Sequence, residues 1–141
     1  MELRLVINII GCLFFILIEE SVHKKRQNEV VHLSYNLLED KVDMKQSLII
    51  NNQMNFYVGT EHFVALDSVS GLNINDLSKL KILTIKEFNV QEMKERKSRI
   101  DSVNKKVTIL YKDQIFDTIY LYRLKEDSSI VRYNVKWLEE I

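Results

Sequence analysis

Residues 118–138, TIYLYRLKEDSSIVRYNVKWL, show the clearest secondary-structure pattern in the chain. Two alternating runs, 118–124 and 130–138, flank a polar turn at 126–129. In the second run Val131, Tyr133, Val135 and Trp137 share one face, and Arg132, Asn134 and Lys136 share the other. Successive side chains of a strand point to opposite faces, so this pattern predicts antiparallel strands with one packed and one solvated face.

Further apolar runs precede this stretch. Residues 47–51, 54–58 and 62–69 are separated by Asn51-Asn52 and by a polar break at 59–61, which predicts consecutive strands joined by tight turns. Residues 106–112 also alternate, with Tyr111 on the apolar face. Together these runs predict a meander of antiparallel strands.

Helices are expected at two places. Thr84 followed by Glu87 has the form of a capping box, with Leu83 and Phe88 at the hydrophobic-staple positions, which predicts a helix from Ile85 to about Arg99. Residues 29–42 fit either a helix or a strand, and we favour the helix because no turn signal interrupts them. The predicted fold class is therefore α+β: a small antiparallel sheet with one or two packed helices in a single domain at 29–141.

An almost wholly apolar run, LRLVINIIGCLFFILI, occupies residues 3–18 and forms the centre of an N-terminal hydrophobic segment at 1–20. It is shorter than the roughly 20 apolar residues that span a bilayer core. Residues 9–12, Ile-Ile-Gly-Cys, resemble the lipobox of bacterial lipoproteins, and that resemblance implies lipidation at Cys12. We therefore expect membrane association at the cell envelope through an uncleaved anchor, a lipoprotein signal or a cleaved signal peptide.

The side of the membrane stays open at this stage. The polar linker at 21–28 carries Lys24, Lys25 and Arg26, which would hold the domain on the cytoplasmic side of an anchor. A signal peptide or a lipobox would place it outside instead. The absence of proline and the abundance of Lys, Asn and Ile are typical of AT-rich bacterial genomes.

Composition excludes several classes of function. The 20 basic and 20 acidic residues cancel, which gives no electrostatic basis for nucleic-acid binding. The lone cysteine excludes an internal disulfide, and the three histidines lack metal-ligand spacing, so no metal is expected. The three glycines are far apart, and we expect no cofactor, because neither a dinucleotide-binding nor a phosphate-binding glycine motif is present.

Few residues suggest chemistry. His62 beside Glu61 has the form of a general base, and Asp113 and Asp117 have the form of paired carboxylates; a solvated loop edge and a turn are the simpler readings. An aromatic group offers a possible interaction surface, with cross-strand packing as its alternative. Its members are Tyr111, Tyr120, Tyr122, Tyr133 and Trp137.

Three hypotheses about function follow. The first is a non-enzymatic accessory domain that is tethered at the envelope and binds another protein. The second is a small hydrolase-like enzyme that uses His62 or the Asp113 and Asp117 pair. The third is a structural protein that self-assembles by pairing strands between copies. We favour the first, because the hydrophobic segment and the aromatic strands are present without a catalytic motif.

Overall fold

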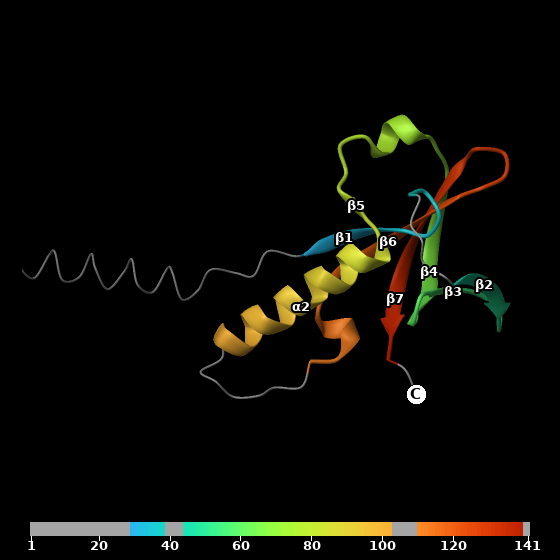
Figure 1. Cartoon of the computed structure of the whole chain (residues 1–141). Helices are drawn as coiled ribbons and strands as arrows, with labels where there is room; N and C mark the ends of the chain where they lie inside the picture. The colour runs from blue at the N-terminus through green and yellow to red at the C-terminus, as the bar shows by residue number, and fades with distance from the viewer. Residues whose placement is uncertain (1–28, 39–43, 103–109, 140–141) are drawn as a thin grey trace, which may run out of the picture.

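The computed structural model describes residues 29–38, 44–102 and 110–139, which form a seven-stranded mixed sheet. The strand order is β2-β3-β4-β7-β6-β1-β5 (Figure 1). The elements, in chain order, are β1 (Val30–Ser34), β2 (Lys45–Ile50), β3 (Gln53–Val58), β4 (Glu61–Leu72), η1 (Ile74–Leu77), β5 (Ile82–Leu83), α2 (Ile85–Ser102), η2 (Lys112–Gln114), β6 (Thr118–Leu124) and β7 (Ile130–Leu138).

The predicted small antiparallel sheet is wrong, because β1 runs parallel to both of its neighbours. The register aligns His32 of β1 with Tyr120 of β6 on one side and with Ile82 of β5 on the other. The pairings from β2 through β3, β4 and β7 to β6 are antiparallel. Parallel neighbours need long crossover connections, which local alternation does not reveal. In the described residues the result is a large mixed sheet with a single α-helix, α2.

The helix expected over 29–42 is also wrong, since Val30–Ser34 form β1. Val31 and Leu33 point into the core and are 2% and 0% exposed. The strand period therefore prevails over the helical one. β1 lies between β6 and β5 in the sheet, and one of its faces is buried in the core. Residues 39–42 lie outside the described residues.

Several local predictions are confirmed. Thr84 and Glu87 form a capping box: the Glu87 N–H donates to Thr84 Oγ1 at 3.2 Å, and the Thr84 N–H donates to Glu87 Oε2 at 2.9 Å. The two predicted C-terminal strands form the antiparallel β6–β7 hairpin, and Val131, Tyr133, Val135 and Trp137 share a buried face of β7 as predicted. The strand expected at 106–112 is wrong where it can be checked: residues 110–111 are not in a strand and Lys112 begins η2, while 106–109 lie outside the described residues.

The main core lies between α2 and one face of the sheet. Phe88 of α2 is fully buried, with its ring 4.8 Å from that of Trp137 and 5.3 Å from that of Phe116. A smaller cluster on the opposite face joins Leu77 of η1 to Tyr122 and Ile130. Both faces of the β6–β7 hairpin are thus covered, which differs from the predicted single packed face.

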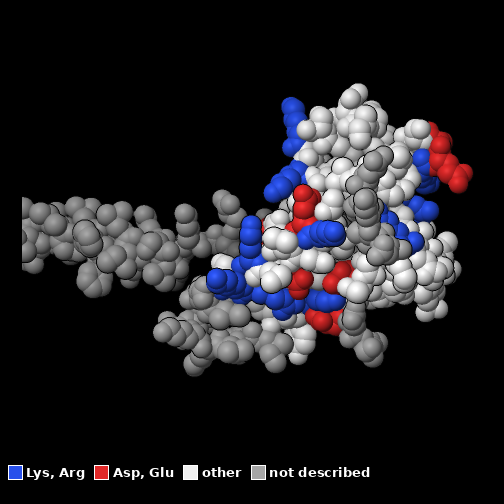
Figure 2. Space-filling model, in the orientation of Figure 1, with Lys and Arg blue, Asp and Glu red and all other residues white. Residues whose placement is uncertain are grey.

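Polar contacts hold two described arginines in the second half of α2. The Arg96 guanidinium donates to the Leu110 carbonyl at 2.6 Å and pairs with Glu92 at 2.9 Å. Arg99 donates to the carbonyls of Gln114 and Ile115. Figure 2 shows Lys and Arg mixed with Asp and Glu where α2 lies, so the charge on this face is balanced over short distances.

Candidate functional site

The strand β2 forms one edge of the sheet, at the opposite end from β5 (Figure 1). Among the described strands β3 is its one neighbour, paired from Lys45 with Val58 to Ile50 with Gln53. Asn51 and Asn52 make the two-residue turn with φ values of 50° and 63°. Positive φ at both positions matches a type I′ turn, whose twist suits a tight hairpin. This turn joins β2 to β3 in a tight hairpin.

The outer half of β2 exposes large apolar side chains. Leu48, Ile49 and Ile50 are 41%, 72% and 42% exposed. Cross-strand partners share a face, so Ile49 lies on the face of its partner Met54, and Leu48 and Ile50 lie on the other face. Charged side chains are sparse over the visible surface of the β2–β3 hairpin (Figure 2). An edge strand with apolar groups on both faces has the composition of an interior strand.

His62 and Glu61, the candidate base and its neighbour, point to opposite faces of β4. The Nε2 atom of His62 lies 2.8 Å from Asn55 Oδ1, and its ring stacks on Tyr57 at 4.3 Å. Burial lowers the pKa of His62. Glu61 Oε2 instead accepts hydrogen bonds from Trp137 Nε1 and Lys112 Nζ, each at 2.7 Å. The structure therefore does not bring this pair together.

Asp113 and Asp117 have different surroundings. Asp113 is exposed in η2, whereas Asp117 lies just before β6 and its Oδ2 accepts a hydrogen bond from the Glu29 N–H at 2.6 Å. The Asp117 N–H donates in return to the Glu29 carbonyl at 3.1 Å. Asp117 thus fastens the start of β1 beside β6.

The five aromatic residues of the predicted interaction surface are divided between the two faces of the sheet. Tyr133 and Trp137 are 8% and 2% exposed on the face that α2 covers, and Tyr122 is 1% exposed on the other. Tyr120 is half-buried, and Tyr111 is 57% exposed beside η2. Most of this group therefore packs within the protein, as its cross-strand alternative anticipates.

A polar cluster that the sequence did not indicate lies around His32. Its Nδ1 atom is 2.8 Å from the Tyr122 hydroxyl, and its ring stacks on Tyr120 at 5.7 Å. The Arg132 guanidinium lies 4.5 Å from the centre of the Tyr120 ring. Burial, together with the nearby Arg132 charge, lowers the pKa of His32. Burial likewise raises the pKa of Tyr122. Both shifts favour neutral side chains, so the cluster is suited to holding β1, β6 and β7 together.

The predicted membrane segment at 3–18, with Cys12, lies outside the described residues. Among the described helices, none is long and apolar enough to cross a membrane. The described residues also contain no group of three or more acidic, histidine or cysteine side chains that could hold a metal ion.

Comparison with known proteins identifies no relative: no family model, curated protein or solved structure matches the chain. The apolar edge of β2 is the most distinctive surface among the described residues of this protein.

Proposed function

We propose that this protein is a membrane-associated, non-enzymatic interaction domain of the cell envelope that binds a partner polypeptide along β2. The single observation that carries this proposal is the exposure of Leu48, Ile49 and Ile50 on a six-residue edge strand. Residues 3–18 would supply the attachment to the membrane.

Within the described residues, the edge of β2 beyond Lys45 lacks the usual protection against strand pairing. Proteins shield their edge strands with charges, prolines, bulges or very short length. Residues 46–50 carry no charge, the chain contains no proline, and the β2–β3 register is continuous. An edge of this kind favours the addition of another strand.

The partner's chemistry follows from the two faces of β2. An added strand gains main-chain hydrogen bonds along the edge, and its alternate side chains meet the two faces in turn. One set would pack on Ile49 and the other on Leu48 and Ile50. We therefore expect an extended segment with apolar side chains on both faces.

Photo-cross-linking of the full chain in membranes tests the proposal. A photoreactive residue replaces Leu48 in one variant and Val90, which is 52% exposed on α2, in a matched control. We expect a specific product from position 48 that contains a second, different polypeptide, and none from position 90. Ile49→Lys should reduce the product, because a charge at the edge opposes strand addition.

The mass of the product separates the two ways in which this edge could act. A product of twice the chain mass would instead indicate self-assembly between copies of this chain, which uncharged residues 46–50 would permit because they can pair antiparallel with themselves without like-charge contacts. Equal products from positions 48 and 90, or none from either, would overturn binding along β2.

Membrane attachment has a separate test. Intact-mass measurement of the protein from membranes distinguishes the three alternatives for residues 3–18. A start at Cys12 with added acyl mass indicates a lipoprotein, a start beyond Ile18 a cleaved signal, and an intact Met1 an anchor. Recovery in the soluble fraction alone would contradict membrane association.

A further inference from the structure

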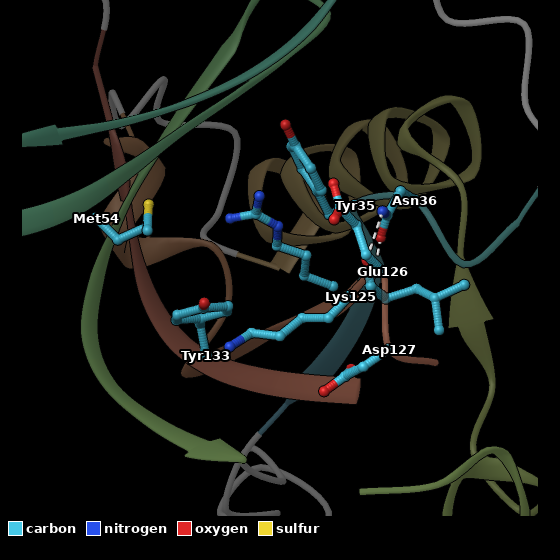
Figure 3. A pocket seen from close by; sticks show the side chains of 9 residues that line it. Tyr35, Asn36, Met54, Lys125, Glu126, Asp127 and Tyr133 are labelled. Atoms are coloured by element: carbon cyan, nitrogen blue, oxygen red, sulfur yellow. Dashed lines mark hydrogen bonds between the residues drawn. The ribbon is translucent and has the colours of Figure 1, made fainter. Parts of the chain in front are cut away.

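A cavity of about 680 Å³ opens beside the β6–β7 turn. We call it the Tyr35 cavity. Its walls come from the end of β1, from β3 and from the β6–β7 hairpin (Figure 3). The lining includes Tyr35, Asn36, Met54, Arg123, Tyr133 and residues 124–127. Its volume is within the range of cavities that bind small molecules.

The cavity has an aromatic base. Tyr35 and Tyr133 form this base, and the fully buried Phe56 behind them contacts both rings edge to face, at 5.4 Å and 4.7 Å. Met54 of β3 adds an apolar side chain to the wall. Planar or apolar groups pack favourably on such surfaces.

Hydrogen bonds fix the wall between β1 and β6. The Asn36 side chain donates to the Leu124 carbonyl at 2.9 Å and accepts from the Leu124 N–H at 2.7 Å (Figure 3). The Tyr35 N–H donates to the Tyr122 carbonyl at 2.9 Å. This part of the cavity is therefore ordered before any ligand enters, which reduces the entropic cost of binding.

A half-buried arginine, Arg123, lies in this wall. Arg123 sits 5.7 Å from the centre of the Tyr35 ring and forms no ion pair within the described residues. Lys125 extends toward Tyr133 (Figure 3). A guanidinium binds a carboxylate through two parallel hydrogen bonds, and partial burial strengthens such a contact.

Two acidic side chains at the rim limit the charge of the ligand. Glu126 and Asp127 line the same cavity, and Asp127 Oδ1 accepts hydrogen bonds from the Ser129 N–H at 3.0 Å and hydroxyl at 2.5 Å. Their charges would repel a polyanion more than a singly charged group. We infer that the Tyr35 cavity binds a small monocarboxylate whose planar, apolar body rests on the aromatic base and whose carboxylate meets Arg123.

Methionine methyl NMR of the full chain in detergent tests this inference. Met54 is the methionine that lines the cavity, while Met93 lies exposed on α2 and serves as an internal control. Phenylacetate should shift the Met54 methyl signal saturably, with a Kd of about a millimolar, and leave Met93 unchanged. Phenylacetamide, which has the same shape without the charge, should bind about tenfold more weakly.

Two arginine variants complete the test. Arg123→Gln should weaken phenylacetate binding about tenfold, and Arg132→Gln, on the opposite face of the sheet, should not. Equal affinities for the acid and the amide, no saturable shift of Met54, or unchanged binding in Arg123→Gln would each overturn the inference. If Arg123→Gln fails to fold, the acid-against-amide comparison on the natural protein still decides.

Discussion

The two edges of the sheet, β5 and β2, are built in opposite ways. β5 consists of Ile82–Leu83 alone, with Leu83 only 4% exposed, and Thr84 then caps α2 directly. β2 is six residues long and ends in three exposed apolar side chains, of which Ile49 is 72% exposed.

Under the proposed function, this difference separates an edge that supports the core from an edge that accepts a partner strand. A two-residue edge that turns at once into a helix gives a partner strand little to pair with. A long apolar edge offers both main-chain groups and side chains. We therefore expect substitutions at β5 to affect stability, and we propose that substitutions at β2 affect binding.

The largest expected effect is at the β5 edge. Leu83→Ala should lower the free energy of unfolding by about 2–5 kcal/mol, because it leaves a cavity in the core beneath α2. Urea denaturation followed by circular dichroism measures this change. A loss below about 0.5 kcal/mol would mean that β5 does not contribute to the core as described.

A smaller effect is expected where β5 meets α2. Thr84→Ala removes the side-chain acceptor for the Glu87 N–H and should cost about 1 kcal/mol. Thr84→Ser keeps the hydroxyl and serves as the control in the same denaturation experiment. Equal losses in both variants would show that the capping hydrogen bond is not the source of stability.

In acid, protonation of His32, which lies next to β5, should destabilise the folded protein more than protonation of His62, which lies nearer β2. His32 aligns with β5, whereas His62 pairs with Tyr57 of β3, next to β2. Burial lowers both pKa values below the ordinary 6.5, and Arg132 lowers that of His32 further. The folded protein then binds these protons more weakly than the unfolded chain does. Stability is therefore fully present above the ordinary pKa and is lost as the pH falls below it.

Urea denaturation at about pH 7.5 and about pH 5.5 measures this loss. His32→Asn should remove more of the pH dependence than the matched variant His62→Gln, in which the side-chain amide replaces Nε2. The same pH dependence in the natural protein and both variants would contradict these assignments.

The smallest effect on stability is expected at β2 itself. Ile49→Ala should change the free energy of unfolding by less than about 0.5 kcal/mol, because the side chain is largely in water. Together with Leu83→Ala in the same assay, it compares the two edges directly. A loss of several kcal/mol would show that Ile49 belongs to the core.

Local features of the fold were predictable from sequence. The alternation of Val131, Tyr133 and Val135 predicted β7, and the Thr84 and Glu87 pair predicted the start of α2. Both depend on residues close together in the chain. The place of β1 was not predictable, because Val31 and Leu33 fit helical and strand spacing and their partners in β6 lie far along the sequence.

The candidate site was predictable only in part. The apolar run at 47–51 indicated a strand, but such runs usually lie inside a sheet, so its edge position came only from the strand order. The His32–Tyr122 contact joins residues 90 positions apart, which no local pattern reveals. Four of the five aromatic residues were correctly predicted in strands, whereas Tyr111 precedes η2, and the division of the four between two faces depends on burial by α2 and η1.

Amide hydrogen exchange tests the central claim most directly. Deuterium uptake of the full chain is measured in the native membranes and again after purification in detergent, with β5 and α2 as internal references. Strand addition predicts that the amides of β2 exchange more slowly in the membranes, while those of β5 and α2 are unchanged. Equal uptake by β2 in both preparations would contradict the account.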